Sequence, residues 1–204
     1  MTGIGGARRS EPDWTDAEQQ RAASLIRDVP DFPRPGIRFR DIMPMLADGG
    51  AFGAVVRALT ARCRALVAET SGSGTDGAPV CGAPVDLVAG IEARGFLLAA
   101  PVAHALGCGV LTVRKPDKLP GPTLEQRYQL EYGTDGLAVQ PALAAGSRVV
   151  LVDDVLATGG TLAAAGTLLA RAGGSVLGAV VLLELVELGG RSRVDLDVRA
   201  LLRG

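Results

Sequence analysis

The spacing of apolar residues predicts two helices in the first third of the chain. Thr15-x-x-Glu18 is a capping-box pattern, which predicts a helix reaching about Asp28. A second helix is predicted over about 50–69, because its apolar residues recur at helical spacing on one face. These residues are Phe52, Val55, Val56, Leu59, Cys63 and Leu66. Between the two helices, 29–41 has three prolines within seven residues, so we expect a shaped loop rather than a regular element.

From residue 85 onward, continuous apolar runs alternate with helical segments. Such runs suit strands buried on both faces of a parallel sheet, which right-handed crossover helices then cover. We therefore predict an α/β fold, with a Rossmann-like parallel sheet flanked by helices. The predicted strands are 85–90, 109–113, 148–152 and 175–186, and the predicted helices are 96–106 and 161–172.

Three segments fall outside this alternation. Residues 1–13 are polar and glycine-rich, which indicates a disordered N-terminal tail. The low-complexity segment 70–84 indicates a flexible surface insertion. Residues 114–136 form a long excursion rich in proline, glycine and charge. We expect 14–204 to form a single domain, because a chain of this length can build one substantial core.

Composition narrows the class of protein. The chain has 204 residues, 48% of them apolar, and a formal net charge of −1, so no global attraction to nucleic acid or to a membrane is implied. The uncharged stretch 95–113 is interrupted by Pro101 and Gly107 and does not predict a membrane span. The cysteines lack metal-ligand spacing, and the N-terminus lacks the apolar core of a secretory signal. We therefore expect a cytoplasmic protein.

Two adjacent carboxylates follow the predicted strand 148–152. Ligands bind beyond the carboxyl ends of strands in such a sheet, so Asp153 and Asp154 suit the vicinal hydroxyls of a ribose. The next helix exposes N–H groups at its N-terminus, and Gly159–Gly160 lets the backbone approach a phosphate there. An acidic cap with a glycine turn is the alternative for these residues alone. The phosphoribosyl-binding candidates are Asp153, Asp154, Ala157, Thr158, Gly159, Gly160 and Thr161.

The segment VVLVDDVLATGGT (149–161) resembles the signature of type I phosphoribosyltransferases, which use 5-phosphoribosyl 1-diphosphate. It has neither Walker A nor dinucleotide-binding spacing. Four further segments appear in the order seen in adenine phosphoribosyltransferases: DFPRPGIRFRDI (31–42), IEARGFLLAAPVA (91–103), VRKPDKLPGPT (113–123) and YQLEYG (128–133). The resemblance covers most of 31–190 and implies that family's fold, with a small hood and a flexible lid loop at 114–133.

The resemblance implies a purine salvage reaction, in which adenine and 5-phosphoribosyl 1-diphosphate give AMP and diphosphate through an oxocarbenium-like transition state. The leaving diphosphate is then expected at the loop formed by Glu92, Ala93 and Arg94, with a cis peptide between Glu92 and Ala93. Lys115 and Lys118 are implied as further diphosphate contacts, although a solvated basic face is the alternative for either. Arg94 and Lys115 are also implied as catalytic residues.

The same resemblance implies how the base and the proton are handled. Phe39 would stack on adenine, and the backbone of Arg38 and Arg40 would contact the polar edge of the base, with a core phenylalanine as the alternative. Glu131 is implied as the catalytic carboxyl group that manages the proton at adenine N7, with an exposed hairpin glutamate as the alternative. The implied lid residues are Tyr128 and Tyr132.

Mg²⁺ is the implied cofactor, held mostly through substrate and water oxygens, with Asp153 as a candidate direct ligand. The implied assembly is a homodimer, with no nucleic acid or membrane partner. Two rival functions remain open. An enzyme for a 6-oxopurine would usually carry a lysine in a C-terminal segment that we do not find. A sensor of 5-phosphoribosyl 1-diphosphate that regulates transcription would need a DNA-binding module, which the residues before 31 do not supply. Arg127 and the short C-terminus depart from the family pattern.

Overall fold

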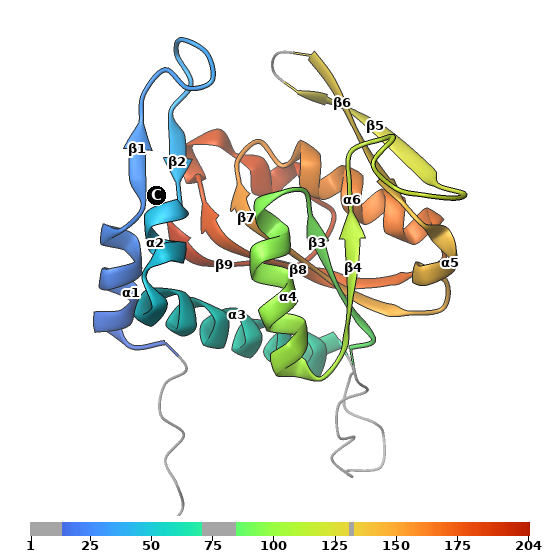
Figure 1. The fold of residues 1–204 in the computed structure, drawn as a ribbon, viewed down its shortest axis with the longest axis horizontal. Coiled ribbons are helices and arrows are strands. Elements are labelled where there is room, and N and C mark those ends of the chain that lie inside the picture. Colours follow the sequence, from blue (N-terminus) through green and yellow to red (C-terminus); the bar gives the residue numbers. More distant parts are fainter. Residues whose placement is uncertain (1–13, 71–84, 131–132) are drawn as a thin grey trace, which may run out of the picture. The chain divides into compact units, whose positions relative to one another are not determined.

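The structure, a computed structural model, describes residues 14–70, 85–130 and 133–204 (Figure 1). The chain separates into two compact units, Met1–Ala58 and Leu59–Gly204, and each is described by itself. The tail 1–13 and all of the insertion except Thr70 lie outside the described residues. The expectation that 14–204 forms one domain stays a prediction.

The first unit begins with a helix whose start was predicted correctly. In α1 (Asp16–Ser24), Thr15 Oγ1 accepts from the backbone N–H of Glu18, and the Glu18 carboxylate accepts from the N–H of Thr15. The helix ends at Ser24, so its predicted end at Asp28 was wrong. A proline disfavours the helical conformation in the residue before it, and Val29 precedes Pro30. The chain forms a strand there instead.

That strand makes a small antiparallel ladder, which the sequence did not predict. Strand β1 (Arg27–Val29) pairs with β2 (Phe39–Asp41), so the end of the segment 29–41 is regular rather than a loop. A short helix, α2 (Met43–Ala47), follows it. The long helix α3 (Gly49–Thr70) begins next and confirms the helix predicted over about 50–69.

The second unit contains a five-stranded parallel sheet in the order β4-β3-β7-β8-β9. This arrangement, with flanking helices, confirms the predicted fold class. The last strand in this order was not predicted. The strands are β3 (Leu87–Ile91), β4 (Gly109–Val113), β7 (Arg148–Leu156), β8 (Ser175–Glu184) and β9 (Val198–Arg203).

The direction in which strands are added to the sheet reverses between β3 and β7. From β3 the chain passes through α4 (Arg94–Leu106) to β4 on one side, whereas from β7 it passes through α6 (Gly160–Arg171) to β8 on the other. Right-handed crossovers in opposite directions place the two helices on opposite faces of the sheet, and Figure 1 shows α4 in front of it. Such a reversal opens a crevice at the carboxyl ends of the two central strands.

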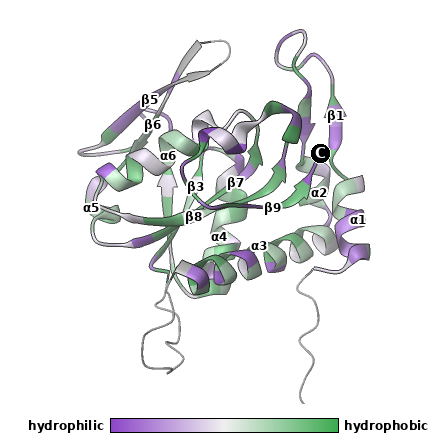
Figure 2. Cartoon of the chain, turned by 180° about the vertical axis from the view of Figure 1, so that it is seen from behind, coloured by the Kyte–Doolittle hydropathy of each residue, from purple (hydrophilic) through white to green (hydrophobic). Residues whose placement is uncertain are grey.

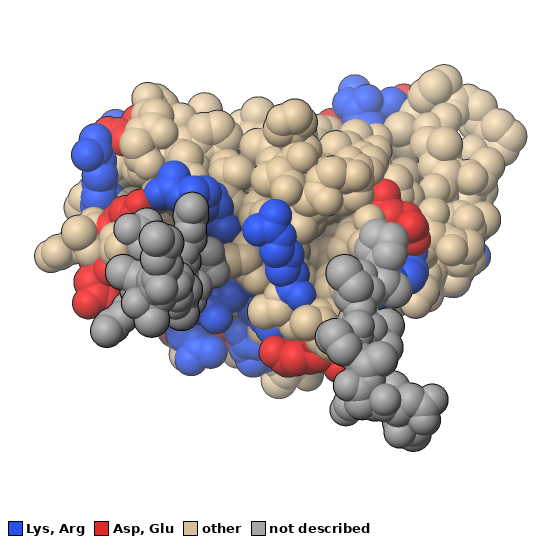
Figure 3. All heavy atoms as spheres, turned by 90° about the horizontal axis from the view of Figure 1, so that it is seen from below, with Lys and Arg blue, Asp and Glu red and all other residues tan. Residues whose placement is uncertain are grey.

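The core of the second unit lies between the sheet and α6. Figure 2 shows that β3, β7 and β8 are hydrophobic over most of their length, as expected for strands covered on both faces. Fully burying such a side chain contributes about 1.5–3 kcal/mol. The largest fully buried side chains of this core include Ile91, Leu137, Leu151, Leu156, Leu168 and Leu169. On the face drawn in Figure 3, basic and acidic side chains are interspersed, in keeping with the small net charge.

Much of the segment 114–136, expected to be an irregular excursion, is an antiparallel hairpin. Strand β5 (Leu124–Leu130) pairs with β6 (Gly133–Val139) in continuous register. The helix α5 (Pro141–Ala144) follows the hairpin. Two short 3₁₀ turns, η1 (Val186–Leu188) and η2 (Gly190–Arg193), then lead from β8 toward β9. Within the described residues, none of the helices combines the length and apolar character that a membrane crossing requires.

The buried thiol of Cys63 gives a test of the packing around α3. Its side chain is fully buried, and burial raises the pKa of the thiol to about 12. In a Cys81→Ser background at about pH 8, we expect iodoacetamide to label the partly exposed Cys108 first and Cys63 only as fast as the protein unfolds. Peptide mass spectrometry after timed labelling distinguishes the two sites. Equal labelling rates in the native protein would contradict the packing described here.

Candidate active site

The two adjacent carboxylates lie inside strand β7, near its carboxyl end. Pairing with β3 stops at Val152, whereas pairing with β8 continues to Leu156. The strand is therefore longer than the predicted 148–152, and Asp153 and Asp154 lie where one neighbouring strand has already ended. Both residues are buried, with 9% and 6% of their surface exposed. The acidic pair thus lies near the carboxyl end of β7, at the reversal point of the sheet, although inside the strand rather than just beyond it as predicted.

Arg94 and the backbone compensate this pair of buried acids. Arg94 is the first residue of α4, and its Nε lies 2.7 Å from Oδ2 of Asp154. The backbone N–H of Asp154 donates to Oδ1 of Asp153 over 2.9 Å. A Cβ at Gly95 would lie 2.8 Å from that same oxygen, so only glycine lets the start of α4 approach the acids this closely.

Burial shifts the titration of both acids. Removal from water raises the pKa of Asp153 well above its ordinary value, and the neighbouring charge of Asp154 acts in the same direction. Burial also raises the pKa of Asp154, although the charge of Arg94 opposes this. A ligand that donates hydrogen bonds to the ionised carboxylates would therefore stabilise a form that the protein alone holds at a cost.

The loop after β7 ends in a helix N-terminus suited to an anion. Gly159 precedes α6 with a φ of +83°, a backbone conformation that favours glycine. Within the described residues no side chain caps this helix, so its first N–H groups are available to a ligand. The backbone of Ala157 and the hydroxyls of Thr158 and Thr161 belong to the same turn. The predicted phosphate-binding segment therefore has the required local structure.

The loop expected to hold diphosphate joins β3 to α4. The peptide between Glu92 and Ala93 is cis, which confirms that prediction. The Glu92 carboxylate accepts from the backbone N–H of Lys115 over 2.8 Å and pairs with Arg114 at 3.4 Å. Burial acts to raise the pKa of Glu92, but these two donors outweigh it and leave the pKa below its ordinary value. Glu92 thereby connects the ends of β3 and β4.

Lys115 and Tyr128 are joined by a carboxylate that sequence reasoning missed. The Nζ of Lys115 forms an ion pair with Asp135 of β6, and the hydroxyl of Tyr128 donates to that carboxylate over 3.4 Å. Thr161 Oγ1 in turn donates to the Tyr128 hydroxyl over 3.2 Å. The network connects the hairpin to the start of α6. Lys118 is exposed, and its carbonyl oxygen accepts from Arg114.

The adenine-binding candidates lie in the first unit, on or beside β2. The ring of Phe39 packs edge-to-face against Phe32, with centroids 5.1 Å apart, and Phe39 is only partly buried. Both flanking arginines form ion pairs with Asp28, at 3.8 Å for Arg38 and more closely for Arg40. Their side chains are thus engaged within this unit, and the proposed role of their backbone stays a prediction.

Some predicted residues lie outside what the structure describes, and some important residues were not predicted. Glu131 and Tyr132 fall outside the described residues, so their roles are untested. Among residues 14–70, 85–130 and 133–204, no group of three or more histidine, cysteine, aspartate or glutamate side chains could hold a metal ion. Sequence reasoning also missed Glu184 and Arg191. A sequence signal near them is Gly190, where the structure has a close backbone approach that leaves no room for a side chain.

The family model and highly similar relatives point to the same protein family. Residues 53–197 match the model of the phosphoribosyl transferase domain. A protein of Clavibacter michiganensis named adenine phosphoribosyltransferase is 55% identical over 181 residues, which cover 88% of this chain and 93% of that one. One of Frankia casuarinae with the same name is 51% identical, covering 92% of each chain.

Solved structures agree with the relatives. The adenine phosphoribosyltransferase of Rhodothermus marinus has a TM-score of 0.79 and 38% identity, covering 93% of this chain and all of that one. The enzyme of Saccharomyces cerevisiae, solved with an imino-altritol bisphosphate and adenine, has a TM-score of 0.80 and 34% identity. That match covers 92% of this chain and all of the yeast chain.

The close approach of α4 to the acids predicts a cost for enlarging Gly95. In Gly95→Ala, the added methyl group would meet Asp153 Oδ1 at 2.8 Å and the Val152 carbonyl oxygen at 3.0 Å. We expect a loss of about 1–3 kcal/mol in the free energy of unfolding, measured by urea denaturation. The matched control is Gly53→Ala in α3, where the nearest atom would be the flexible Arg57 Nη1 at 3.8 Å. It should gain about 0.5–1 kcal/mol, and equal gains in both variants would contradict the close packing.

The raised pKa of Asp153 predicts that its charged form lowers the stability of the folded protein at high pH. The folded protein holds this proton more tightly than the unfolded chain, so the stabilising contribution is complete below the ordinary carboxyl pKa and is lost as pH rises through the folded pKa. Asp153→Asn removes that loss. Without ligand and divalent metal, we expect a higher Tm than wild type at about pH 8 and no gain at about pH 4. A lower Tm at the higher pH would show that the charged form is well compensated.

Proposed function

The chain belongs to the adenine phosphoribosyltransferases, within the phosphoribosyl transferase domain family, and we propose that the site at the sheet reversal carries out their reaction. The protein is a purine salvage enzyme that transfers the 5-phosphoribosyl group of 5-phosphoribosyl 1-diphosphate to adenine, giving AMP and diphosphate. The observation that carries the assignment to this site is the buried acidic pair beside an uncapped helix N-terminus, at the reversal point of the sheet.

The two halves of that site suit the two ends of a ribose 5-phosphate. The carboxylates of Asp153 and Asp154 accept hydrogen bonds from the ribose hydroxyls, which also stabilises their ionised forms. The 5-phosphate binds the N–H groups that open α6, from Gly159 to Thr161, where the helix dipole favours negative charge. The acids and the phosphate then occupy different ends of the sugar, so their charges do not meet.

The leaving group and the purine are handled by other residues. As the bond from C1 to the diphosphate oxygen breaks and the bond to adenine N9 forms, negative charge accumulates on diphosphate. The Glu92–Arg94 loop, Lys115 and Lys118 bind that charge. Glu131 accepts the proton that adenine N7 loses. The adenine ring stacks on Phe39, beside the backbone of Arg38 and Arg40.

Substrate binding then replaces ion pairs that lie within the protein. Arg94 lies against Asp154, and Lys115 lies against Asp135, so both cations already have a carboxylate partner. Diphosphate carries more negative charge than either carboxylate and competes for the same donors. Tyr128 lies between Asp135 and Thr161, so it can transmit that exchange to the start of α6. Tyr132 serves with Tyr128 in the lid.

We propose Mg²⁺ as the cofactor. The available donors support a metal held mainly by diphosphate, ribose and water oxygens, with Asp153 as the candidate protein ligand. An ion held there would supply positive charge opposite the departing diphosphate. We also propose a cytoplasmic homodimer. Free thiols at Cys63 and Cys108 support the cytoplasmic location. The exposed apolar side chains of Leu97 and Val110 support the homodimer.

The reaction is tested by adenine-dependent release of diphosphate from 5-phosphoribosyl 1-diphosphate in the presence of Mg²⁺. We expect Glu131→Gln to lower kcat by about 10²–10⁴-fold, because the proton acceptor is lost. The matched control is Glu125→Gln, an exposed glutamate on β5, which should leave kcat unchanged. Turnover of hypoxanthine or guanine in place of adenine would overturn the assigned base, and activity undiminished by EDTA would overturn the proposed cofactor.

A further inference from the structure

The loop 157–159 lies against Gly190 of η2, about thirty residues further along the chain. A methyl group added at Gly190 would overlap the carbonyl oxygen of Ala157 and lie 2.8 Å from the backbone nitrogen of Gly159. One added at Gly159 would lie 3.1 Å from the carbonyl carbon of Gly190 and 3.2 Å from Val194. The backbones of η2 and of the loop are therefore in direct contact. Any shift of η2 is a shift of the surface against which the phosphate loop lies.

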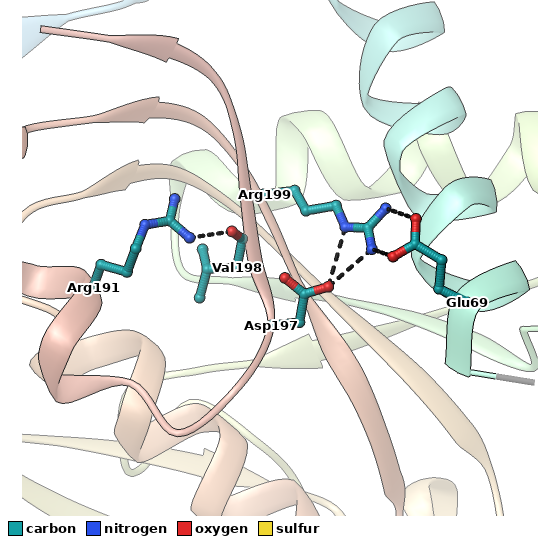
Figure 4. A network of polar contacts seen from close by, with 5 residues as sticks. All are labelled: Glu69, Arg191, Asp197, Val198 and Arg199. Atoms are coloured by element: carbon teal, nitrogen blue, oxygen red, sulfur yellow. Dashed lines mark hydrogen bonds and ion pairs between the residues drawn. The ribbon is translucent and has the colours of Figure 1, made fainter. Parts of the chain in front are cut away.

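Arg191 connects η2 to the last two strands of the sheet. Arg191 binds both carboxylate oxygens of Glu184, with Nε 2.8 Å from Oε1 and Nη2 2.6 Å from Oε2. Its Nη1 donates to the carbonyl oxygen of Val198 in β9, as Figure 4 shows. Such a two-pronged pairing defines the orientation of the guanidinium group as well as its distance.

Glu184 connects this arginine to the root of the loop. It is the last residue of β8, only 5% exposed, and lies opposite Leu156 in the β7–β8 register. The N–H of Leu185 donates to the Leu156 carbonyl oxygen over 2.9 Å. Since Leu156 immediately precedes the phosphate loop, Arg191 connects the strand from which the loop departs with the turn that supports the loop from behind.

We propose that Arg191, through Glu184, is a positioning residue for 5-phosphoribosyl 1-diphosphate, because it holds Gly190 against the loop that binds the 5-phosphate. The inference rests on the proposed function of that loop. The side-chain hydrogen bonds of Arg191 go to Glu184 and to the carbonyl oxygen of Val198, so Arg191 acts on the phosphate-binding N–H groups indirectly. Its effect is on where those N–H groups point, and small displacements of binding groups have large effects on productive binding.

The electrostatics of the pair agree with this role. Arg191 holds the pKa of Glu184 below its ordinary value, so the carboxylate stays ionised despite its burial. Arg203 lies 3.4 Å from the same carboxylate and is much more exposed. Without Arg191, Glu184 therefore keeps a cation nearby, but η2 loses its tie to β8 and β9. The expected defect is a displaced turn, with Glu184 still paired to Arg203.

A neighbouring arginine provides a matched control. Arg199 of β9 pairs with Glu69 at 2.5 Å and with Asp197 at 2.9 Å, in the network drawn in Figure 4. Like Arg191 it is a partly buried guanidinium that pairs with carboxylates, but its partners are Glu69 near the end of α3 and Asp197 just before β9. Loss of Arg199 should affect stability without moving η2.

The test compares steady-state kinetics and Tm of full-length Arg191→Gln, Arg191→Lys and Arg199→Gln. We expect Arg191→Gln to raise the KM for 5-phosphoribosyl 1-diphosphate by about tenfold or more, with the KM for adenine within about twofold of wild type. Arg191→Lys should recover only part of the loss, because lysine restores the charge without the two-pronged geometry. Arg199→Gln should lower Tm and leave both KM values unchanged.

Two results would overturn the inference: a lower Tm in Arg191→Gln with an unchanged KM for 5-phosphoribosyl 1-diphosphate, or an equal rise in that KM for Arg199→Gln. If Arg191→Gln does not fold, hydrogen exchange of Arg191→Lys decides. Faster exchange at amides 157–161 than in wild type supports the positioning role, and unchanged exchange overturns it. Absence of adenine turnover by the wild-type enzyme would instead overturn the proposed function, and the exchange measurement would still decide whether Arg191 orders the loop.

Discussion

The structure of the second unit depends on the burial of two adjacent carboxylates at the reversal point of a parallel sheet. Removing the carboxylates of Asp153 and Asp154 from water is unfavourable. Either the surrounding elements supply hydrogen-bond donors and positive charge, or the acids take up protons. The helix α4 supplies Arg94 from its first turn, and it can approach because the next residue is Gly95. The start of α4 therefore lies directly against the acidic pair. The same burial explains why a ribose, which donates hydroxyl groups, suits this position.

The anion-binding half of the site is built from backbone rather than from a general positive field. With a net charge of −1, the protein has no global attraction for a phosphorylated substrate. In the proposed function the attraction is local, from the N-terminus of α6 and the glycines that allow the chain to turn there. Backbone N–H groups bind well only when they point in the right direction, so the loop needs support from behind. The close contact between Gly190 and Ala157–Gly159 supplies that support.

The charged side chains around the acidic pair and the hairpin are paired with one another. Lys115 and Arg94 each lie against a carboxylate, and Glu92 accepts from the backbone N–H of Lys115. An isolated cation in a partly buried site would be costly, and so would an isolated acid. Pairing them keeps the protein stable before substrate arrives, while the hairpin that carries Asp135 and Tyr128 remains attached to the start of α6. In the proposed function, diphosphate and ribose would replace these internal partners.

Local patterns in the sequence were sufficient to predict many of the helices and strands around the site. The capping box at Thr15, the strands flanking the acidic pair and the glycine-rich start of α6 depend on neighbouring residues, so the sequence alone predicted them correctly. Resemblance to the family added the cis peptide after Glu92. The sequence did not predict strands that depend on pairing between distant segments. Strand β9 pairs with β8, and β1 pairs with β2. The partners of Lys115 and Arg191 were likewise decided by the fold, because Asp135 and Glu184 are ordinary surface-type residues in the sequence. Their roles arise only when the hairpin and the β8–η2 turn bring them to the site, since ion pairs depend on distance in space rather than along the chain.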